Sequence, residues 1–422
     1  MPQVVENSRR RGLPVSDRLT VLSRPDERLR TTSFCLAVGF GARHDPAGGN
    51  GAAHLLEHLL MTAPMAGAGS LSEYTERGGG ESNAVTGLET MLFEARVLTE
   101  DAPAVLERLL LAVAAPALTP SVLAAERQVV LQELASAAAD PSDVVQDAFL
   151  ARLFQGHPLG RPVGGSVEEL NRIDAGGLAA VHSGDFLRRD MALVSVGGMS
   201  EEAVRAVVHA SELAVRAGGP PPEQPPPEQR TGHQLPLLRR DLDVSWPQDD
   251  FCWLALGARA PHSTAPQRHA FVVLAQLLGS SPSSRLYRAL RGEAALAYAF
   301  AAWSRGYQES GAWRVLVGTE TRNGPHVVAV VVGLLEQLAA DGPDEADLDA
   351  ARRQAAMQLT VRSESPLEHA RLLAQRALDR TAPACVDEET AALRRVTADD
   401  IRRAAAELLA ELNLVVRPEA RR

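Results

Sequence analysis

The chain has 422 residues, 45% of them hydrophobic, and a formal net charge of -10 at neutral pH. This length exceeds the usual size of one domain, about 100 to 200 residues, so at least two domains are predicted. The composition lies near the globular average, which excludes a fibrous or wholly disordered protein, and the acidic balance argues against nucleic acid as a partner.

The amino terminus lacks a segment typical of export. Arginines at positions 9–11 are followed by further charged residues before any apolar stretch of signal-peptide length. The longest apolar runs, such as 327–335, fall short of the roughly 20 residues that a membrane helix needs. Three separated cysteines fit neither a disulfide framework nor a zinc cluster and are expected in the core: Cys35, Cys252 and Cys385. We therefore expect a cytoplasmic protein that spans no membrane.

In the first half of the chain, an apolar run at 34–39 predicts a strand that ends in glycine. The turn GARHDPAGGN follows, and residues 52–61 then have helical periodicity. Further helices and strands are predicted by the same patterns: helices at 104–114 and 124–138, and strands at 91–97 and 192–196.

The predicted helix at 52–61 contains the sequence HLLEH, the strongest chemical signal in the chain. Positions i, i+3 and i+4 share one helical face, so His54, Glu57 and His58 point the same way. Two neutral imidazoles four residues apart suit Zn²⁺, and a catalytic zinc takes three protein ligands and leaves one position for water. The motif therefore predicts a metal site with a third ligand from elsewhere. A packed helix with two incidental histidines is the alternative.

The segment GGNGAAHLLEHLLM, which inverts the common HExxH order, resembles the zinc-site helix of the pitrilysin family. That family includes insulin-degrading enzyme and the mitochondrial processing peptidases, and its third ligand is a glutamate in a later helix similar to AERQVVLQE here. The resemblance implies that Glu133 is this ligand and that Glu57 is the general base. Glu126, two helical turns before Glu133, would hydrogen-bond a ligating imidazole. An ordinary surface glutamate is the alternative for Glu126.

Between these helices, the segment GGGESNAVT resembles the glycine-rich turn of the family and the strand that follows it. The resemblance implies that Asn83 and Ala84 pair with the substrate backbone, which would join the sheet as an added strand. Asn83 has an alternative interpretation as a turn residue with positive φ. Further along, HPLGRP looks like a structural segment of the family, so His157 is not expected to bind metal.

A proline-rich stretch, AGGPPPEQPPPEQRTG at 217–232, lies near the middle of the chain. Proline removes amide donors and fixes φ, so neither a helix nor a central strand can continue through it. It predicts an extended linker at 218–232 between a zinc-binding domain at 1–217 and a second domain at 233–422.

The two halves echo each other in sequence. The apolar run FCLAVG at 34–39 has a counterpart, FCWLALG, at 251–257, and a turn beginning GAR and a helical segment follow each of them. In the second half, helices are predicted at 268–278, 344–361 and 398–409, and a strand at 313–317. We therefore predict an α+β fold of two tandem, duplicated domains, each a largely antiparallel sheet packed with helices.

The second half lacks HxxEH at the echoed position and is not expected to bind zinc. Its segment SRLYRALRGEAALAY resembles a pitrilysin-family signature whose arginine and tyrosine, seven residues apart, contact substrate over the zinc. The resemblance assigns these roles to Arg291, as an anchor for substrate, and to Tyr298, whose phenol would donate to the oxyanion on the scissile carbonyl. Without the resemblance, both would be ordinary helix and strand residues.

By this resemblance the chain is a zinc metalloendopeptidase with one Zn²⁺ per chain, which hydrolyses unfolded peptides or leader segments with Glu57 as general base. It is about half as long as the single-chain members of the family, so a homodimer or a heterodimer with a paralogue is expected. Arg291 and Tyr298 of one protomer would then complete the zinc site of the other. The alternative is a non-catalytic or partner-dependent subunit of a peptidase-like complex.

Overall fold

The computed structural model of the protein describes residues 13–65, 69–218, 235–293, 295–378 and 386–419. The chain divides into two compact units, each with its own sheet and hydrophobic core. The first unit contains residues up to 134, 161–232 and 362–385, and the second contains 135–160, 233–361 and 386–422. Nearly all of the predicted linker, 219–232, lies outside the described residues, as does Cys385.

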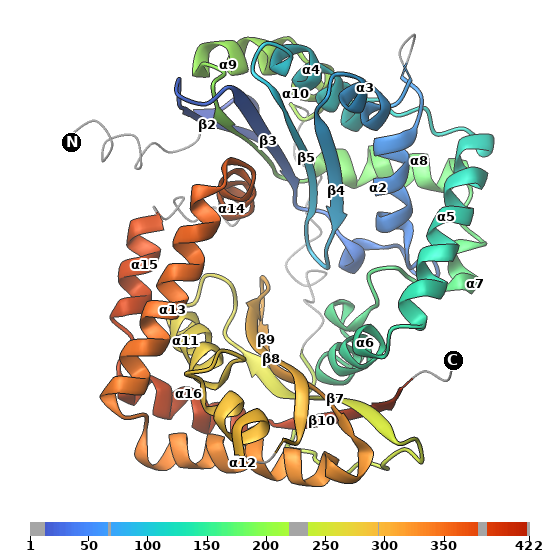
Figure 1. The fold of residues 1–422 in the computed structure, drawn as a ribbon. Coiled ribbons are helices and arrows are strands. Elements are labelled where there is room, and N and C mark those ends of the chain that lie inside the picture. The colour runs from blue at the N-terminus through green and yellow to red at the C-terminus, as the bar shows by residue number, and fades with distance from the viewer. Residues whose placement is uncertain (1–12, 66–68, 219–234, 294, 379–385, 420–422) are drawn as a thin grey trace. The chain divides into compact units, whose positions relative to one another are not determined.

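A six-stranded sheet in the order β1-β2-β6-β3-β5-β4 forms the centre of the first unit (Figure 1). Its neighbouring strands are antiparallel except for β2 and β6, which run parallel. The strands are β1 (Leu13–Pro14), β2 (Leu19–Pro25), β3 (Thr31–Val38), β4 (Glu81–Thr86), β5 (Met91–Leu98) and β6 (Met191–Gly197). The helices are α2 (Ala52–Thr62), α3 (Leu71–Arg77), α4 (Ala102–Ala114), α5 (Pro120–Ala138), α7 (Val167–Leu170), α8 (Ala175–Gly184), α9 (Glu201–Ala210), α10 (Glu212–Arg216) and α14 (Pro366–Leu378).

The two faces of this sheet bury different side chains, because successive residues of a strand point to opposite faces. On β3, Phe34 and Leu36 join a large core with residues of α2, α4, α8 and α9. The intervening Cys35 and Ala37 pack instead with residues of α14. The strand is therefore buried from Thr32 onward and apolar from Phe34 to Val38, as expected for one that is covered on both faces.

A four-stranded antiparallel sheet in the order β10-β7-β9-β8 forms the centre of the second unit. Helices α11, α12 and α16 supply residues to the core on one of its faces. Gly257 of β7 faces the other way, where an added Cβ would lie 2.9 Å from the ring of Phe149 in α6. The strands are β7 (Phe251–Ala260), β8 (Ala297–Gly306), β9 (Gly311–Glu320) and β10 (Asn413–Pro418). The helices are α6 (Pro141–Leu153), α11 (Arg268–Leu278), α12 (Gly324–Asp341), α13 (Glu345–Glu364), α15 (Val386–Arg394) and α16 (Ala398–Ala410).

The order of elements confirms the predicted α+β fold of two duplicated domains. The first half runs β3-α2-β4-β5-α4-α5-α6-β6 and the second runs β7-α11-β8-β9-α12-α13-α14-β10, with α3, α7 and α8 as additional helices in the first and α15 and α16 in the second. The strand order β6-β3-β5-β4 in one sheet matches β10-β7-β9-β8 in the other. Equivalent strands thus have equivalent neighbours in the two sheets.

Each sheet also packs against a helix from the other half of the sequence. Helix α14 packs against β3 and β6 of the first unit, and its counterpart α6 packs against β7 and β10 of the second. The boundaries between the units fall within two long helices: α5, which precedes α6, and α13, which precedes α14. The compact units therefore differ from the predicted domains 1–217 and 233–422 by a reciprocal exchange of 135–160 and 362–385. The proline-rich stretch marks the sequence repeat, whereas side-chain packing decides which helix joins which core.

One segment, Thr321–Asp341, is long and apolar enough to cross a membrane when judged by length and composition. It contains α12, so the apolar run at 327–335 belongs to a longer apolar helix than the sequence indicated. Val327, Val331, Leu335 and Leu338 recur at helical spacing and are buried in the core of the second unit. A third of the apolar window, 33%, is buried in this way.

Candidate metal centre

Helix α2 presents the HLLEH sequence within the first unit. Its four leucines are at most 1% exposed and hold the helix in the core: Leu55, Leu56, Leu59 and Leu60. His54, Glu57 and His58 are only partly buried on the remaining face. The helix predicted at 52–61 is confirmed, and it ends one residue later, at Thr62.

Helix α5 brings Glu133 to the two imidazoles. Its Oε2 atom lies 3.4 Å from Nε2 of His54 and 3.3 Å from Nε2 of His58, and the three potential ligand atoms lie within 4.8 Å of one another. Tetrahedral coordination with bonds of about 2.0 to 2.1 Å places neighbouring ligand atoms about 3.3 to 3.4 Å apart. The residues predicted as ligands are therefore brought together at separations that fit Zn²⁺.

Glu126 lies on the far side of His58 from Glu133. Its Oε2 atom is 3.3 Å from Nδ1 of His58, and both side chains are largely buried, with exposed fractions of 16% and 14%. An ordinary surface glutamate would be more exposed, so this alternative does not describe Glu126. A proton held on Nδ1 by a carboxylate leaves Nε2 free to bind a metal.

The environment of His54 favours its neutral form. Burial lowers the pKa of His54, and this effect outweighs the nearby carboxylates of Glu57 and Glu133, which raise it. Neutral imidazole is the form that binds metal. Nδ1 of His54 is buried and has no hydrogen-bond partner among the described residues.

Asp45 is a residue of this region that the sequence did not single out. It is 5% exposed and lies before α2, where its carboxylate accepts hydrogen bonds from the backbone N–H groups of Gly51, at 2.7 Å, and Ala53, at 2.8 Å. Burial raises the pKa of Asp45 to about 7, although these two N–H groups and Arg161 lower it. The sequence signal for this role was an acidic residue in the turn before the motif helix. A capping side chain is expected at the N-cap, but Asp45 lies six positions before the N-cap, Gly51.

Two other sequence expectations concern residues that are not part of the metal cluster. Asn83 and Ala84 lie in β4, an edge strand whose one partner among the described strands is β5. Asn83 has no positive φ, so its interpretation as a turn residue is wrong; the positive φ occurs at Gly79 in the preceding turn. His157 is buried in the second unit, where its Nδ1 accepts a hydrogen bond from the backbone N–H of Leu159 at 3.2 Å.

Arg291 and Tyr298 belong to the second unit, so the metal cluster is complete within the first unit without them. Arg291 lies in a π-helical segment, η4 (Tyr287–Glu293), and Tyr298 lies on β8 with 80% of its surface exposed. Ala295, between the two, has a φ of 48°, which residues other than glycine rarely adopt. π-Helical turns and strained backbone are both frequent at functional sites.

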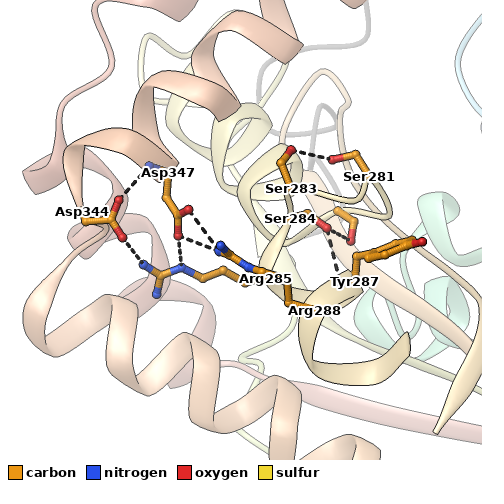
Figure 2. Close-up of polar contacts among 9 residues, drawn as sticks. Ser281, Ser283, Ser284, Arg285, Tyr287, Arg288, Asp344 and Asp347 are labelled. Carbon is orange, nitrogen blue, oxygen red and sulfur yellow. Dashed lines mark hydrogen bonds and ion pairs between the residues drawn. The ribbon is translucent and has the colours of Figure 1, made fainter. Parts of the chain in front are cut away.

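Figure 2 shows how the start of η4 is held. Asp347 of α13 accepts hydrogen bonds from Arg285, at 3.0 Å, and from Arg288, at 2.9 and 3.1 Å. The hydroxyl of Ser284 donates to the carbonyl of Gly279 at 2.7 Å. These contacts give the SRLYRALR sequence a structural role, because its first two arginines attach η4 to α13.

Two protein-family models match the chain. Residues 20–166 match the model described as Insulinase (Peptidase family M16), and residues 186–355 match the model described as Peptidase M16 inactive domain. The first match contains the metal cluster, and the second contains Arg291 and Tyr298.

Curated relatives extend this similarity over most of the chain. A protein of Mycobacterium tuberculosis named as an uncharacterized zinc protease is 31% identical over 328 residues, which is 77% of this chain and 73% of the relative. A similarly named protein of Streptomyces coelicolor is 26% identical over 407 residues, which is 95% of this chain and 87% of the relative.

Solved structures share the fold. A protease from Helicobacter pylori aligns with a TM-score of 0.78 and 19% identity, covering 95% of this chain and 97% of that chain. A structure described as a peptidase M16 inactive domain from Pseudomonas fluorescens aligns with a TM-score of 0.80 and 16% identity, covering 96% and 97%. At these identities the likeness concerns the fold alone.

Proposed function

Because the chain belongs to peptidase family M16, we propose that it is a zinc-dependent endopeptidase that hydrolyses unfolded peptides or leader segments. One observation carries this proposal: Oε2 of Glu133 lies 3.4 Å from Nε2 of His54 and 3.3 Å from Nε2 of His58. The two histidines share their face of α2 with Glu57. A packed helix with incidental histidines would not require a carboxylate from a second helix at these separations.

Each residue of the cluster has a separate task in this proposal. Zinc bound here would act as a Lewis acid and lower the pKa of a water molecule toward about 7. His54 and His58 would hold the ion through neutral Nε2 atoms, and the single charge of Glu133 would leave the ion with its three ligands a net positive charge. Glu126 keeps the proton on Nδ1 of His58. The carboxylate of Glu57 would accept a proton from this water molecule and pass it to the nitrogen of the leaving amine.

Strand β4 supports an extended peptide as the substrate. It forms one edge of the first sheet, so its outer backbone groups are available to an added strand. In this proposal the substrate pairs beside Asn83 and Ala84. An unfolded segment can present its backbone as such a strand, which supports unfolded segments as the substrate class.

Arg291 and Tyr298 take part in this proposal as substrate-binding residues supplied by a second protomer. The 80% exposure of Tyr298 leaves its phenol free to donate to an oxyanion. A homodimer is the simplest arrangement, because one chain carries both the ligand set and this pair. A heterodimer with a paralogue would use the same contacts.

A non-catalytic or partner-dependent subunit is the second candidate. It is favoured by the match of residues 186–355 to a model described as an inactive domain. The ligands and Glu57 precede that range, so the match does not bear on them. Zinc content tests the non-catalytic form, because such a subunit has no need of a filled site, whereas a partner-dependent subunit would bind zinc but cleave nothing on its own.

The substitution Glu57→Gln tests the proposed base. Glutamine keeps the shape of the side chain but cannot accept the proton, so we expect turnover to fall by about 10² to 10⁴-fold while zinc stays bound. Cleavage of a mixed peptide library is followed by mass spectrometry, with metal analysis of the same samples. Glu76→Gln, at an exposed position of α3, is the matched control and should keep full activity.

Two outcomes would contradict the proposal: cleavage by the wild type that resists a chelator, or no cleavage when zinc fully occupies the site. Sharing between protomers has its own test with the same variant. Mixing Glu57→Gln with Tyr298→Phe should restore activity, because half of the sites in a mixed dimer are intact. Proven subunit exchange without recovery would exclude sharing.

A further inference from the structure

The helix that carries the predicted metal ligands begins without a capping side chain of its own. Its N-cap is Gly51, with a φ of 98°, and the cap makes no side-chain hydrogen bond. A Cβ at this position would lie 2.8 Å from the carbonyl oxygen of Gly164 and from Cδ2 of Leu170. Glycine is therefore required, and the free N–H groups of the first turn need an acceptor from elsewhere.

Asp45 supplies this acceptor. Its Oδ2 takes the N–H of Gly51 at 2.7 Å and its Oδ1 takes the N–H of Ala53 at 2.8 Å, so both carboxylate oxygens are used on one turn. The carboxylate is buried, and its backbone carbonyl accepts a hydrogen bond from Arg161 at 2.9 Å. A negative charge at this end of a helix is also favoured by the helix dipole.

The position of this turn matters for the metal, because His54 directly follows Ala53. Metal sites require ligand distances within about 0.2 Å of their preferred values. A first turn that frays or rotates would move Nε2 of His54 away from Glu133, whereas His58, one turn later, would be less affected. The carboxylate thus acts on the end of the helix where the first ligand lies.

The second unit provides an internal comparison. Its helix α11 begins eleven residues after Gly257, as α2 begins eleven residues after Gly41, and the GAR sequence starts at each of these glycines. The position of Asp45 is occupied there by Pro261, and α11 has no side-chain cap. The capping carboxylate is therefore present before the helix with ligands and absent before the helix without them.

We propose that Asp45 is a positioning residue for the metal centre, which fixes the first turn of α2 and thereby the direction of His54. This inference rests on the proposed function, in that it takes zinc as the ion bound by His54, His58 and Glu133. Asp45 itself touches neither the metal nor the substrate. Its effect should appear as metal affinity rather than only as stability.

The test measures the Kd for zinc of the full-length protein, by competition with a chromophoric chelator, in Asp45→Asn and Asp45→Ala. Asn keeps one acceptor oxygen and should weaken zinc binding on the order of tenfold, and Ala, which removes both, should weaken it up to about 100-fold. Circular dichroism and melting of the zinc-free protein show whether each variant is folded. Asp45→Asn preserves the side-chain shape, so it remains informative if Asp45→Ala does not fold.

Asp344→Asn is the matched control. Asp344 also caps a helix, since its Oδ1 accepts from the backbone N–H of Asp347 at 2.7 Å (Figure 2), but that helix belongs to the second unit. We expect this variant to lower stability slightly and to leave the zinc Kd unchanged. Unchanged zinc binding by Asp45→Asn, or equal weakening in the control, would overturn the inference. A wild-type protein that binds no zinc would instead overturn the proposed function.

Discussion

Helices α2 and α11 occupy the same place in the two units and have the same length of 11 residues, yet only α2 presents polar groups for chemistry. Position for position, three polar residues of α2 are replaced in α11 by apolar ones: His54 by Ala270, Glu57 by Val273 and His58 by Leu274. All three replacements are buried in the core of the second unit. The comparison teaches that the fold can form with apolar residues at these three positions. The polar residues of α2 are therefore not explained by folding alone.

The largest expected effect comes from changing equivalent positions of these two helices, His58 and Leu274, to alanine. His58→Ala removes a ligand, so we expect zinc affinity to fall roughly 10³-fold with a smaller change in the melting of the zinc-free protein than Leu274→Ala causes. Leu274→Ala, at the equivalent position, empties a fully buried site and should cost about 2 to 5 kcal/mol of stability. Chelator competition and thermal melting of both variants check this. Similar changes in melting temperature would remove the distinction between the helices.

The exchanged helices α14 and α6 give a second comparison. Arg371 of α14 makes two hydrogen bonds of 2.5 Å to Glu94 of β5, whose side chain is only 2% exposed. This contact raises the pKa of Arg371, although burial opposes it. The pair on α6 joins Arg152 and Asp241, whose side chains are 44% and 38% exposed. The two helices occupy equivalent places but are held by pairs of different burial.

Removing each arginine should therefore have unequal effects. Arg371→Ala leaves the carboxylate of Glu94 buried without its partner, which costs about 3 kcal/mol or more. Arg152→Ala breaks a solvated pair and a hydrogen bond of 3.1 Å to Asn413, and should cost about 1 kcal/mol. The measurement is the thermal midpoint of each zinc-free variant. If the double variant Glu94→Leu with Arg371→Leu recovers most of the loss, the cost lies in the unpaired charge. Equal destabilisation by the two alanine variants would contradict the contrast.

The sequence predicted the metal cluster better than it predicted the division into units. The HLLEH spacing pointed to His54 and His58 because helix geometry converts such a local spacing directly into a shared face, whereas Glu133 was implied only by the resemblance of AERQVVLQE to a family helix. Neither exchanged helix was predicted. Their partner sheets depend on long-range packing, such as Phe149 beside Gly257, which local periodicity does not contain. Asp45 was missed for a similar reason, since the chain must turn back before its carboxylate meets α2.

The turns before α2 and α11 also differ at the position of His44, and this difference predicts the smallest effect. His44 lies in the GARHD turn where the second half has Ala260. Its Nδ1 accepts a hydrogen bond from the N–H of Gly41 at 3.0 Å, and burial, with smaller effects of Arg189 and Arg43, lowers the pKa of His44 to about 3. The folded protein therefore keeps this imidazole neutral at a pH where an unfolded chain protonates it.

Because the folded pKa lies below the unfolded value of about 6.5, His44 contributes stability above pH 6.5 that is lost as the pH falls toward 3. Between pH 7.5 and 5 the loss should be about 2 kcal/mol. His44→Gln keeps an acceptor for Gly41 but does not titrate, so its stability should fall less over the same interval. Melting of the two zinc-free proteins at both pH values measures this. Other titrating groups, including Asp45, whose contribution to stability changes with pH in the opposite direction, are common to both proteins and cancel when the two changes in stability are subtracted. Parallel pH profiles for the two proteins would show that His44 is protonated in the folded state.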